Sequence, residues 1–190
     1  GEVDPELLCA ACSAAVGSGR PPPPRRVGAS AAVAAFVFTG PVREVIHRGK
    51  YAGDRNALRH LADLGAQRLA GVLARAEGLV AVPLGPRRRR SRGYNQAELI
   101  AGVFAACAGR PLLPGLRRVR ETSPQAARDE IARRNNVEGA FAWHGPRLDG
   151  SHVWLVDDVL TTGATAAAVA SALRAAGAGP VGIAVLAAVP

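Results

Sequence analysis

The sequence is short of lysine, methionine, cysteine and aromatic residues, and these shortages narrow what the protein can be. Lys50 is the single lysine among 24 basic residues, and there is no methionine. Three cysteines, an odd number, do not make a disulfide framework. No apolar run approaches the roughly 20 residues of a membrane helix, and the N-terminal GEVDPELLCAAC lacks the basic region of a signal peptide. We therefore expect a cytoplasmic protein without a membrane span.

Composition and charge indicate a globular protein with a polyanionic partner. Of the 190 residues, 48% are hydrophobic and 21% are charged, as in folded domains. The net charge is +9, and clustered arginine attracts phosphate. Arginine stands almost wherever lysine could, so a compositional bias also explains the charge. The partner is either nucleic acid or a phosphorylated small molecule, although aromatic residues, at 4%, offer few surfaces for base stacking.

Residues 1–28 are interpreted as a leader that precedes a domain at residues 29–190. The leader holds CAAC, Cys9–Cys12, followed by the stiff linker GRPPPPRR. A structural zinc ion normally needs four ligands in two such pairs, and Cys107 is far away in the chain. We therefore expect two small buried thiols or a decayed site at Cys9 and Cys12, without bound zinc.

Strands and helices alternate along the domain, which predicts an α/β fold around a mostly parallel sheet. Apolar residues at helical spacing predict an amphipathic helix over residues 56–75, and Asn95 is the expected N-cap of a helix at 96–108. The segment GKYAGD is expected to be a loop. Strands are predicted near 33–38, 79–84, 116–119, 139–143, 153–156 and from 181 onward, with further helices near 41–49 and 165–176.

The stretch HVWLVDDVLTTGAT, residues 152–165, predicts the functional site. An apolar strand runs into Asp157 and Asp158, which we expect on solvent-facing loop positions, and a threonine-rich loop then leads into a helix. Ligands of open parallel sheets bind beyond the carboxyl ends of the strands, and N–H groups at a helix N-terminus cradle an anion. A ribose 5-phosphate fits both halves, with its diol or a metal ion at the aspartates. Its phosphate would lie at Thr161, Thr162, Gly163, Ala164 and Thr165.

Three other interpretations of this stretch compete with a phosphate-and-sugar site. An apolar strand ending in Asp-Asp also looks like a Walker B strand, but no G-x-x-x-x-G-K-[ST] sequence surrounds the single lysine. Paired aspartates hold metals in nucleases, but nuclease sites gather further carboxylates. A capped turn between strand and helix needs one such residue, not two aspartates and three threonines. The phosphate-and-sugar site is therefore the favoured hypothesis.

Several segments, in order, resemble a known family. VWLVDDVLTTGAT resembles the phosphoribosyl-pyrophosphate (PRPP) motif of type I phosphoribosyltransferases, and RGYNQAELIA, RRVRETSPQ and RRNNVEGAF resemble ComF/GntX-type competence proteins. The resemblance covers about residues 30–190 and implies a type I phosphoribosyltransferase-like fold. It implies that Asp157 and Asp158 contact the ribose hydroxyls and hold Mg²⁺, directly or through water. It also implies that Thr161–Thr165 hold the 5′-phosphate.

Lys50 and the arginine run at 87–92 are further candidates for contact with the ligand. The segment KYAGD, which begins at Lys50, matches the family's lysine-tyrosine-x-glycine loop on the pyrophosphate side, and lysine is a compact cation suited to phosphate. Arg88 and Arg92 follow a predicted strand end, so we favour contact with pyrophosphate; contact with DNA or a solvated surface are the alternatives. Tyr94 either stacks on a base or packs under the loop.

The polar segment between the predicted strands at 116–119 and 139–143 resembles the part of related transferases that closes over the site. Gln125, Arg133 and Asn136 match the family pattern, and Arg128 stands where the family often has leucine. Long polar segments of this kind are usually lids or disordered. Arg133 is therefore the candidate catalytic residue from this segment, together with Lys50 from the other side.

Two functions stay open from the sequence. The first is a phosphoribosyltransferase, in which pyrophosphate leaves C1 of PRPP and a nitrogen nucleophile attacks. Charge on the leaving group would be stabilised by Mg²⁺, Lys50 and loop arginines. The second is a non-catalytic protein that senses PRPP or handles single-stranded DNA during import, with a DNA helicase as a further partner. The acceptor of a transfer reaction is not recognisable in the sequence.

Overall fold

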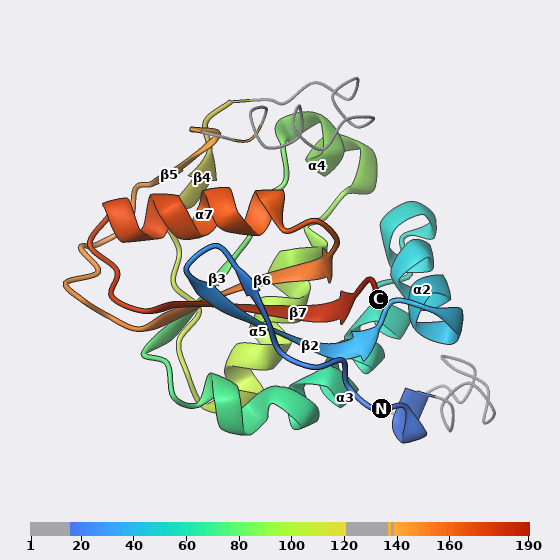
Figure 1. The fold of residues 1–190 in the computed structure, drawn as a ribbon. Helices are drawn as coiled ribbons and strands as arrows, with labels where there is room; N and C mark the ends of the chain where they lie inside the picture. The colour runs from blue at the N-terminus through green and yellow to red at the C-terminus, as the bar shows by residue number, and fades with distance from the viewer. Residues whose placement is uncertain (1–15, 121–136, 138) are drawn as a thin grey trace.

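The computed structural model describes residues 16–120, 137 and 139–190, and a five-stranded sheet forms its centre. Its strands are β1 (Arg25–Val27), β2 (Ser30–Val37), β3 (Gly78–Ala81), β6 (Val153–Leu160) and β7 (Val181–Ala188). Their order across the sheet is β1-β2-β7-β6-β3, and every pair except β1 with β2 is parallel (Figure 1). This arrangement confirms the predicted α/β fold with a mostly parallel sheet.

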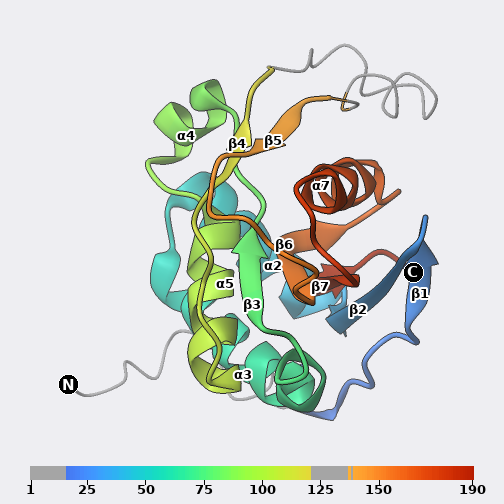
Figure 2. The same cartoon turned by 90° about the vertical axis from the view of Figure 1, so that its left-hand side faces the viewer.

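Helices cover both faces of the sheet (Figure 2). Helices α2 (Gly40–His47), α3 (Arg55–Leu73) and α5 (Gln96–Ala108) pack on one face, and α7 (Ala164–Ala175) packs on the other. All eight residues of β7 are buried, as expected for a central parallel strand that is covered on both sides. In the part of the chain that is described, no helix is both long and apolar enough to cross a membrane.

Capping side chains and glycines set several helix boundaries. Asn95 accepts a hydrogen bond from the backbone N–H of Ala97 (3.1 Å) and starts α5, as predicted. Asp54 accepts one from the N–H of Ala57 (2.9 Å) and starts α3. The arginine run forms a short helix, α4 (Pro86–Arg92), because proline occupies its first turn and Gly93 ends it with φ of 72°.

A second, smaller sheet consists of β4 (Leu116–Arg118) and β5 (Phe141–Trp143), which pair antiparallel. Leu116 and Phe141 are buried in the same apolar cluster as the inner residues of α7. The pair is therefore packed beside α7 and not within the main sheet. Both strands were predicted near these positions, and residues 121–136 and 138, which follow β4, lie outside the described residues.

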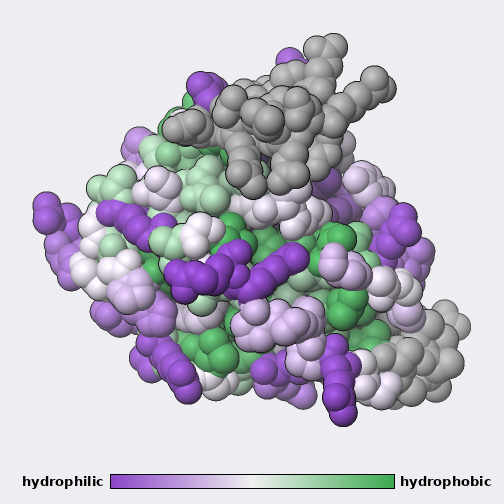
Figure 3. Space-filling model, viewed as in Figure 1, coloured by the Kyte–Doolittle hydropathy of each residue, from purple (hydrophilic) through white to green (hydrophobic). Residues whose placement is uncertain are grey.

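Residues ahead of β2 contact the domain at two places. Val16 is buried in the core, and Arg68 of α3 donates hydrogen bonds to the carbonyl oxygens of Val16 (2.8 Å) and Gly17 (2.7 Å). Strand β1 then forms one edge of the sheet. Figure 3, viewed as in Figure 1, shows hydrophilic side chains over β1 in the middle of the visible face, between apolar side chains. Charged side chains on an edge strand disfavour pairing with another chain.

Two of the elements that differ from the expectation concern the site. GKYAGD, expected to be a loop, begins within η1 (Arg48–Ala52), a π-helical turn that continues α2 and ends at Gly53 with φ of 71°. Strand β6 extends four residues beyond the predicted end at Val156, because its backbone pairs with β7 as far as Ala188. Asp157 and Asp158 therefore lie inside a strand and are partly buried, not on a solvent-facing loop.

A side chain at Gly182 of β7 should destabilise the fold, because a Cβ atom there would lie 2.6 Å from the ring of Trp154 on β6. We expect Gly182→Ala to lower the free energy of unfolding by about 1–3 kcal/mol, the range for overpacked cores, as measured by urea denaturation. Gly102→Ala on α5 is the control, because a Cβ there meets nothing within 4 Å. Alanine in a helix is favoured over glycine by up to about 1 kcal/mol. Equal stability of the two variants would contradict the packing of Trp154 on β7.

Candidate functional site

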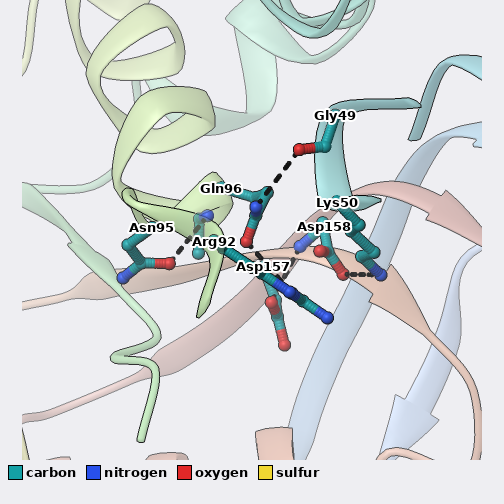
Figure 4. A network of polar contacts seen from close by, with 8 residues as sticks. Gly49, Lys50, Arg92, Asn95, Gln96, Asp157 and Asp158 are labelled. Atoms are coloured by element: carbon teal, nitrogen blue, oxygen red, sulfur yellow. Dashed lines mark hydrogen bonds and ion pairs between the residues drawn. The ribbon is translucent and has the colours of Figure 1, made fainter. Parts of the chain in front are cut away.

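The site is built around Asp157 and Asp158 at the carboxyl end of β6. Figure 4 shows the carboxylate of Asp158 facing Lys50 of η1, while that of Asp157 points away from this lysine. The Lys50 ammonium donates a hydrogen bond to Asp158 Oδ1 at 2.9 Å, and both side chains are less than one-fifth exposed. The backbone N–H of Asp158 donates to Asp157 Oδ1 at 2.8 Å. The two carboxylates thus have different partners although they are neighbours in the chain.

Asp157 is held in an environment that disfavours its charge. Burial is the largest cause, and the neighbouring Asp158 carboxylate adds to it; together they raise the pKa of Asp157 to about 7. The N–H of Asp158 and the cations of Lys50 and Arg92 act in the opposite direction without cancelling the rise. Near neutral pH this carboxyl group is therefore present in both its protonated and its ionised form, and a bound cation would favour the ionised form.

Lys50 lies in η1, and an ion pair between residues on either side of it stabilises this turn. Arg48 forms an ion pair with Asp54 across the turn, and Asp54 also caps α3. Asp54 at the end of the KYAGD segment is therefore used for structure, while Lys50 faces the site. Tyr51 is 74% exposed, with its ring edge-on to His47 at a centroid distance of 5.7 Å.

The segment from Arg92 to Gln96, between α4 and α5, forms the other wall of the site (Figure 4). Arg92 donates to the side-chain oxygen of Gln96 at 3.1 Å, and its guanidinium lies 5.5 Å from the centre of the Tyr51 ring. Tyr94 and Gln96 both donate hydrogen bonds to the carbonyl oxygen of Gly49, at 2.6 Å and 3.4 Å. Of the two roles considered for Tyr94, the structure favours packing beneath the lysine turn.

The threonine loop joins β6 to α7 directly after the aspartates. Thr161 and Thr162 are exposed, and Gly163 adopts φ of 82°, a conformation that favours glycine. The hydroxyl of Thr162 accepts a hydrogen bond from the N–H of Ala164 (3.5 Å). A cavity of about 470 Å³ lies beside the loop, lined by Arg26, Gly28, Thr162, Gly163, Ala167 and Ser171, among others. Helix α7 begins at Ala164, so its N-terminus lies at this loop, where the sequence predicts an anion cradle.

The structure brings together some of the predicted site residues. Lys50, Arg92, Asp157 and Asp158 share one polar network, and the loop of Thr161–Thr165 follows β6 immediately. Arg88 is exposed on α4 and takes no part in this network. The predicted residues of the polar segment, including Arg133, and the leader cysteines, Cys9 and Cys12, lie outside the described residues.

Two residues of the network, Tyr94 and Gln96, were not assigned to the site from the sequence. The sequence leaves two roles open for Tyr94 and indicates Gln96 only as the start of a helix. Their one signal is the segment RGYNQ, which carried the family resemblance without indicating what it contacts. Among the described residues, no group of three or more histidine, cysteine, aspartate or glutamate side chains gathers for a metal ion. A cation here would take at most the two aspartates as such ligands from these residues.

Comparison with known proteins adds information that is independent of the site geometry. Residues 117–190 match the family model described as a phosphoribosyl transferase domain. The chain is 32% identical over 186 residues to the DNA utilization protein YhgH of Salmonella typhi, which covers 93% of this chain and 76% of that protein. It is 35% identical over 101 residues to competence protein F of Haemophilus influenzae, covering 52% and 44%. It is 26% identical over 131 residues to competence protein ComFC of Bacillus subtilis, covering 68% and 52%.

The raised pKa of Asp157 predicts a pH dependence of stability. The folded state holds a proton on Asp157 up to about pH 7, whereas the unfolded chain loses it near pH 4. The stabilising effect of this proton is complete below pH 4 and is lost as the pH rises through 7. We expect the free energy of unfolding in EDTA to fall by about 2–3 kcal/mol more between pH 5 and pH 8 in the wild type than in Asp157→Asn.

Asp63→Asn on the exposed side of α3 is the matched control for this measurement. It removes a carboxylate of the same kind without touching the site, so its pH profile should follow that of the wild type. Groups that all three proteins share contribute equally and cancel in the comparison. Parallel profiles for the wild type and Asp157→Asn would contradict the raised pKa.

Proposed function

Because the chain belongs to the ComF-type family of phosphoribosyltransferase-like proteins and has a type I phosphoribosyltransferase-like α/β fold, we propose that it binds PRPP, or another ribose 5-phosphate, with Mg²⁺. The observation that best supports this proposal is the pairing of Lys50 with Asp158 (2.9 Å) directly ahead of the threonine loop. Hydrogen-bond acceptors for a sugar diol, a cation for pyrophosphate and donors for a phosphate then occur together at the carboxyl end of the sheet.

Each part of the ligand has a partner of matching chemistry in this proposal. The carboxylates of Asp157 and Asp158 accept hydrogen bonds from the two ribose hydroxyls. The N–H groups and hydroxyls of Thr161–Thr165 donate to the 5′-phosphate. Lys50 and Arg92 neutralise the pyrophosphate, and Arg133 is proposed to reach it from the polar segment. Arg88 is exposed outside this network, so the pyrophosphate contact predicted for it from the sequence is kept as the alternative to a role on the DNA-binding surface.

The two carboxylates also fit magnesium. Mg²⁺ prefers hard oxygen ligands and is usually bound by one or two carboxylates plus waters and substrate phosphates. Asp157 and Asp158 supply that number, and because burial raises the pKa of Asp157, a bound cation would stabilise its ionised form. When bound, Mg²⁺ would neutralise charge on the leaving pyrophosphate. The protein's own contribution would be to orient the ribose through its hydroxyls and to add the positive charges of Lys50 and Arg92.

Phosphoribosyl transfer is the reaction that we propose for this site. The bond between C1 and the pyrophosphate oxygen breaks as a nitrogen nucleophile forms its bond to C1, so no side chain has to act as a covalent nucleophile. The chain would supply charge stabilisation, mainly through Lys50. A protein that binds PRPP without turnover uses the same contacts, and pyrophosphate release in a screen of nitrogen bases would distinguish the two.

Handling of single-stranded DNA is the second candidate function. The relatives are named for DNA utilization and competence, and exposed arginines cluster on α4 and around β4. Arg118 of β4 reaches the start of α4, where its Cδ lies 3.6 Å from the Cβ position of Gly85. The exposed members of this arginine surface are Arg87, Arg88, Arg89, Arg90, Arg117 and Arg120. Such a surface suits a phosphate backbone, and a helicase would be a partner in DNA import.

The acidic pair tests the primary proposal. Asp157→Asn combined with Asp158→Asn preserves side-chain shape and the bonds from Lys50 and from the Asp158 N–H, so the double variant should stay folded. We expect its affinity for PRPP with Mg²⁺, measured by calorimetry, to fall at least about 100-fold, as expected when several charge-assisted hydrogen bonds are lost. Asp63→Asn should bind like the wild type. Unchanged affinity in a folded double variant would overturn the site assignment.

The arginine surface tests the second candidate. If it carries DNA, replacing Arg88, Arg89 and Arg90 by alanine should reduce the salt dependence of single-strand affinity. The expected reduction is roughly 0.7 log units per log unit of salt for each phosphate contact that is lost. Arg88 and Arg90 are exposed and Arg89 pairs with Glu98, so PRPP affinity should persist in this variant and fall instead in Arg92→Ala. Loss of PRPP affinity in the triple variant, with PRPP competing against DNA, would place the run at the pyrophosphate.

A further inference from the structure

The carbonyl oxygen of Gly49 receives hydrogen bonds from two side chains that lie far ahead in the chain. The Tyr94 hydroxyl donates at 2.6 Å and the Gln96 amide at 3.4 Å, across 45 and 47 residues. This carbonyl belongs to the peptide unit that leads directly into Lys50. Its orientation therefore sets where the Lys50 side chain starts.

Gln96 is committed to this contact by burial. Its side chain is 1% exposed, and a buried amide is stable only when its polar atoms are paired. Arg92 donates to its oxygen at 3.1 Å, which turns the amide nitrogen toward Gly49. Arg92 also lies close enough to Asp157 to lower its pKa. One arginine thus connects the lysine turn with the aspartate pair.

Tyr94 is also held in place, by packing against Arg55 and by partial burial. The Arg55 guanidinium stacks 4.5 Å from the centre of its ring, and desolvation by burial raises the pKa of its hydroxyl. Gly49 itself is buried, and a Cβ there would lie 3.1 Å from Leu58 of α3 and 3.3 Å from the Tyr94 hydroxyl. The turn is therefore enclosed between α3 and the Tyr94–Gln96 segment.

We propose that Tyr94 and Gln96 are positioning residues that hold the Gly49 peptide so that Lys50 stays at the aspartate pair. They do not touch the ligand; they act through Lys50. As a contribution to PRPP binding this rests on the proposed function, but the effect on Lys50 is measurable without any ligand. The family motif RGYNQ then has a physical role, as the clamp on the lysine turn.

The single lysine of the chain makes this testable by chemical labelling. Lys50 is the one lysine ε-amine in the sequence, so mass spectrometry of the peptide that carries it reports its reaction rate with an amine-selective reagent. In the wild type, the bond to Asp158 and the low exposure of Lys50 protect it. We expect labelling to be several-fold faster in Tyr94→Phe and in Gln96→Met. Tyr51→Phe, which removes a hydroxyl from an exposed neighbour of Lys50, should label like the wild type.

Calorimetry with PRPP and Mg²⁺ then separates positioning from general stability. Tyr94→Phe should weaken binding about 2–10-fold, the range for one hydrogen bond, while the same change in a Lys50→Ala background should have less than a 2-fold effect. Glu98→Gln, on the outer side of α5, should bind like the wild type. Wild-type protein that ignores PRPP, with faster labelling of Tyr94→Phe, would refute the proposed function and leave the positioning role. Wild-type labelling rates in both Tyr94→Phe and Gln96→Met, or equal effects with and without Lys50, would overturn the positioning role.

Discussion

Two adjacent carboxylates at the partly buried end of β6 are the constraint on which the arrangement around them depends. Burying a carboxylate costs free energy unless hydrogen-bond donors or cations compensate its charge. Here the compensating groups come from three separate parts of the chain. Lys50 arrives from the turn after α2, Arg92 from the end of α4, and the Asp158 N–H from β6 itself. They converge because parallel strands bring their carboxyl ends, and the connections that follow them, to one edge of the sheet. Asp157 still keeps a raised pKa, so the compensation is incomplete.

The parts of this arrangement that follow from short-range chemistry could be predicted from the sequence. Asn95 caps α5 because its side chain reaches the N–H of Ala97, two residues further along the chain. The apolar run before Asp157 predicts a buried strand whatever its position in the sheet. The end of β6 could not be predicted in the same way. The apolar pattern ends at Val156, but the strand continues because its backbone pairs with β7. That backbone pairing cannot be inferred from the hydrophobicity of the side chains.

Contacts between segments that are distant in the chain could not be predicted from the sequence. A glutamine at the start of a helix is ordinarily exposed, and Gln96 is buried because Arg92 and Gly49 satisfy its amide. Arg88 and Arg92 are one helical turn apart on α4, yet only Arg92 meets neighbours, Tyr51 and Gln96, that partly bury it. Which arginine of a run faces a site is decided by those neighbours. Composition and spacing could therefore indicate an anionic ligand without choosing between the arginines.

The position of Lys50 has a consequence for how ligands could bind. A single ammonium group cannot neutralise Asp158 and an anionic ligand to the same degree, so Lys50 would have to give up part of its bond to the carboxylate when an anion approaches. Asp158 would then need another positive partner, and a carboxylate of this kind accepts a divalent cation. Anion and cation would therefore strengthen each other's binding, and the coupling would be reciprocal. Under the proposed function, a site with this architecture selects a phosphorylated ligand and its metal together and binds either one alone more weakly.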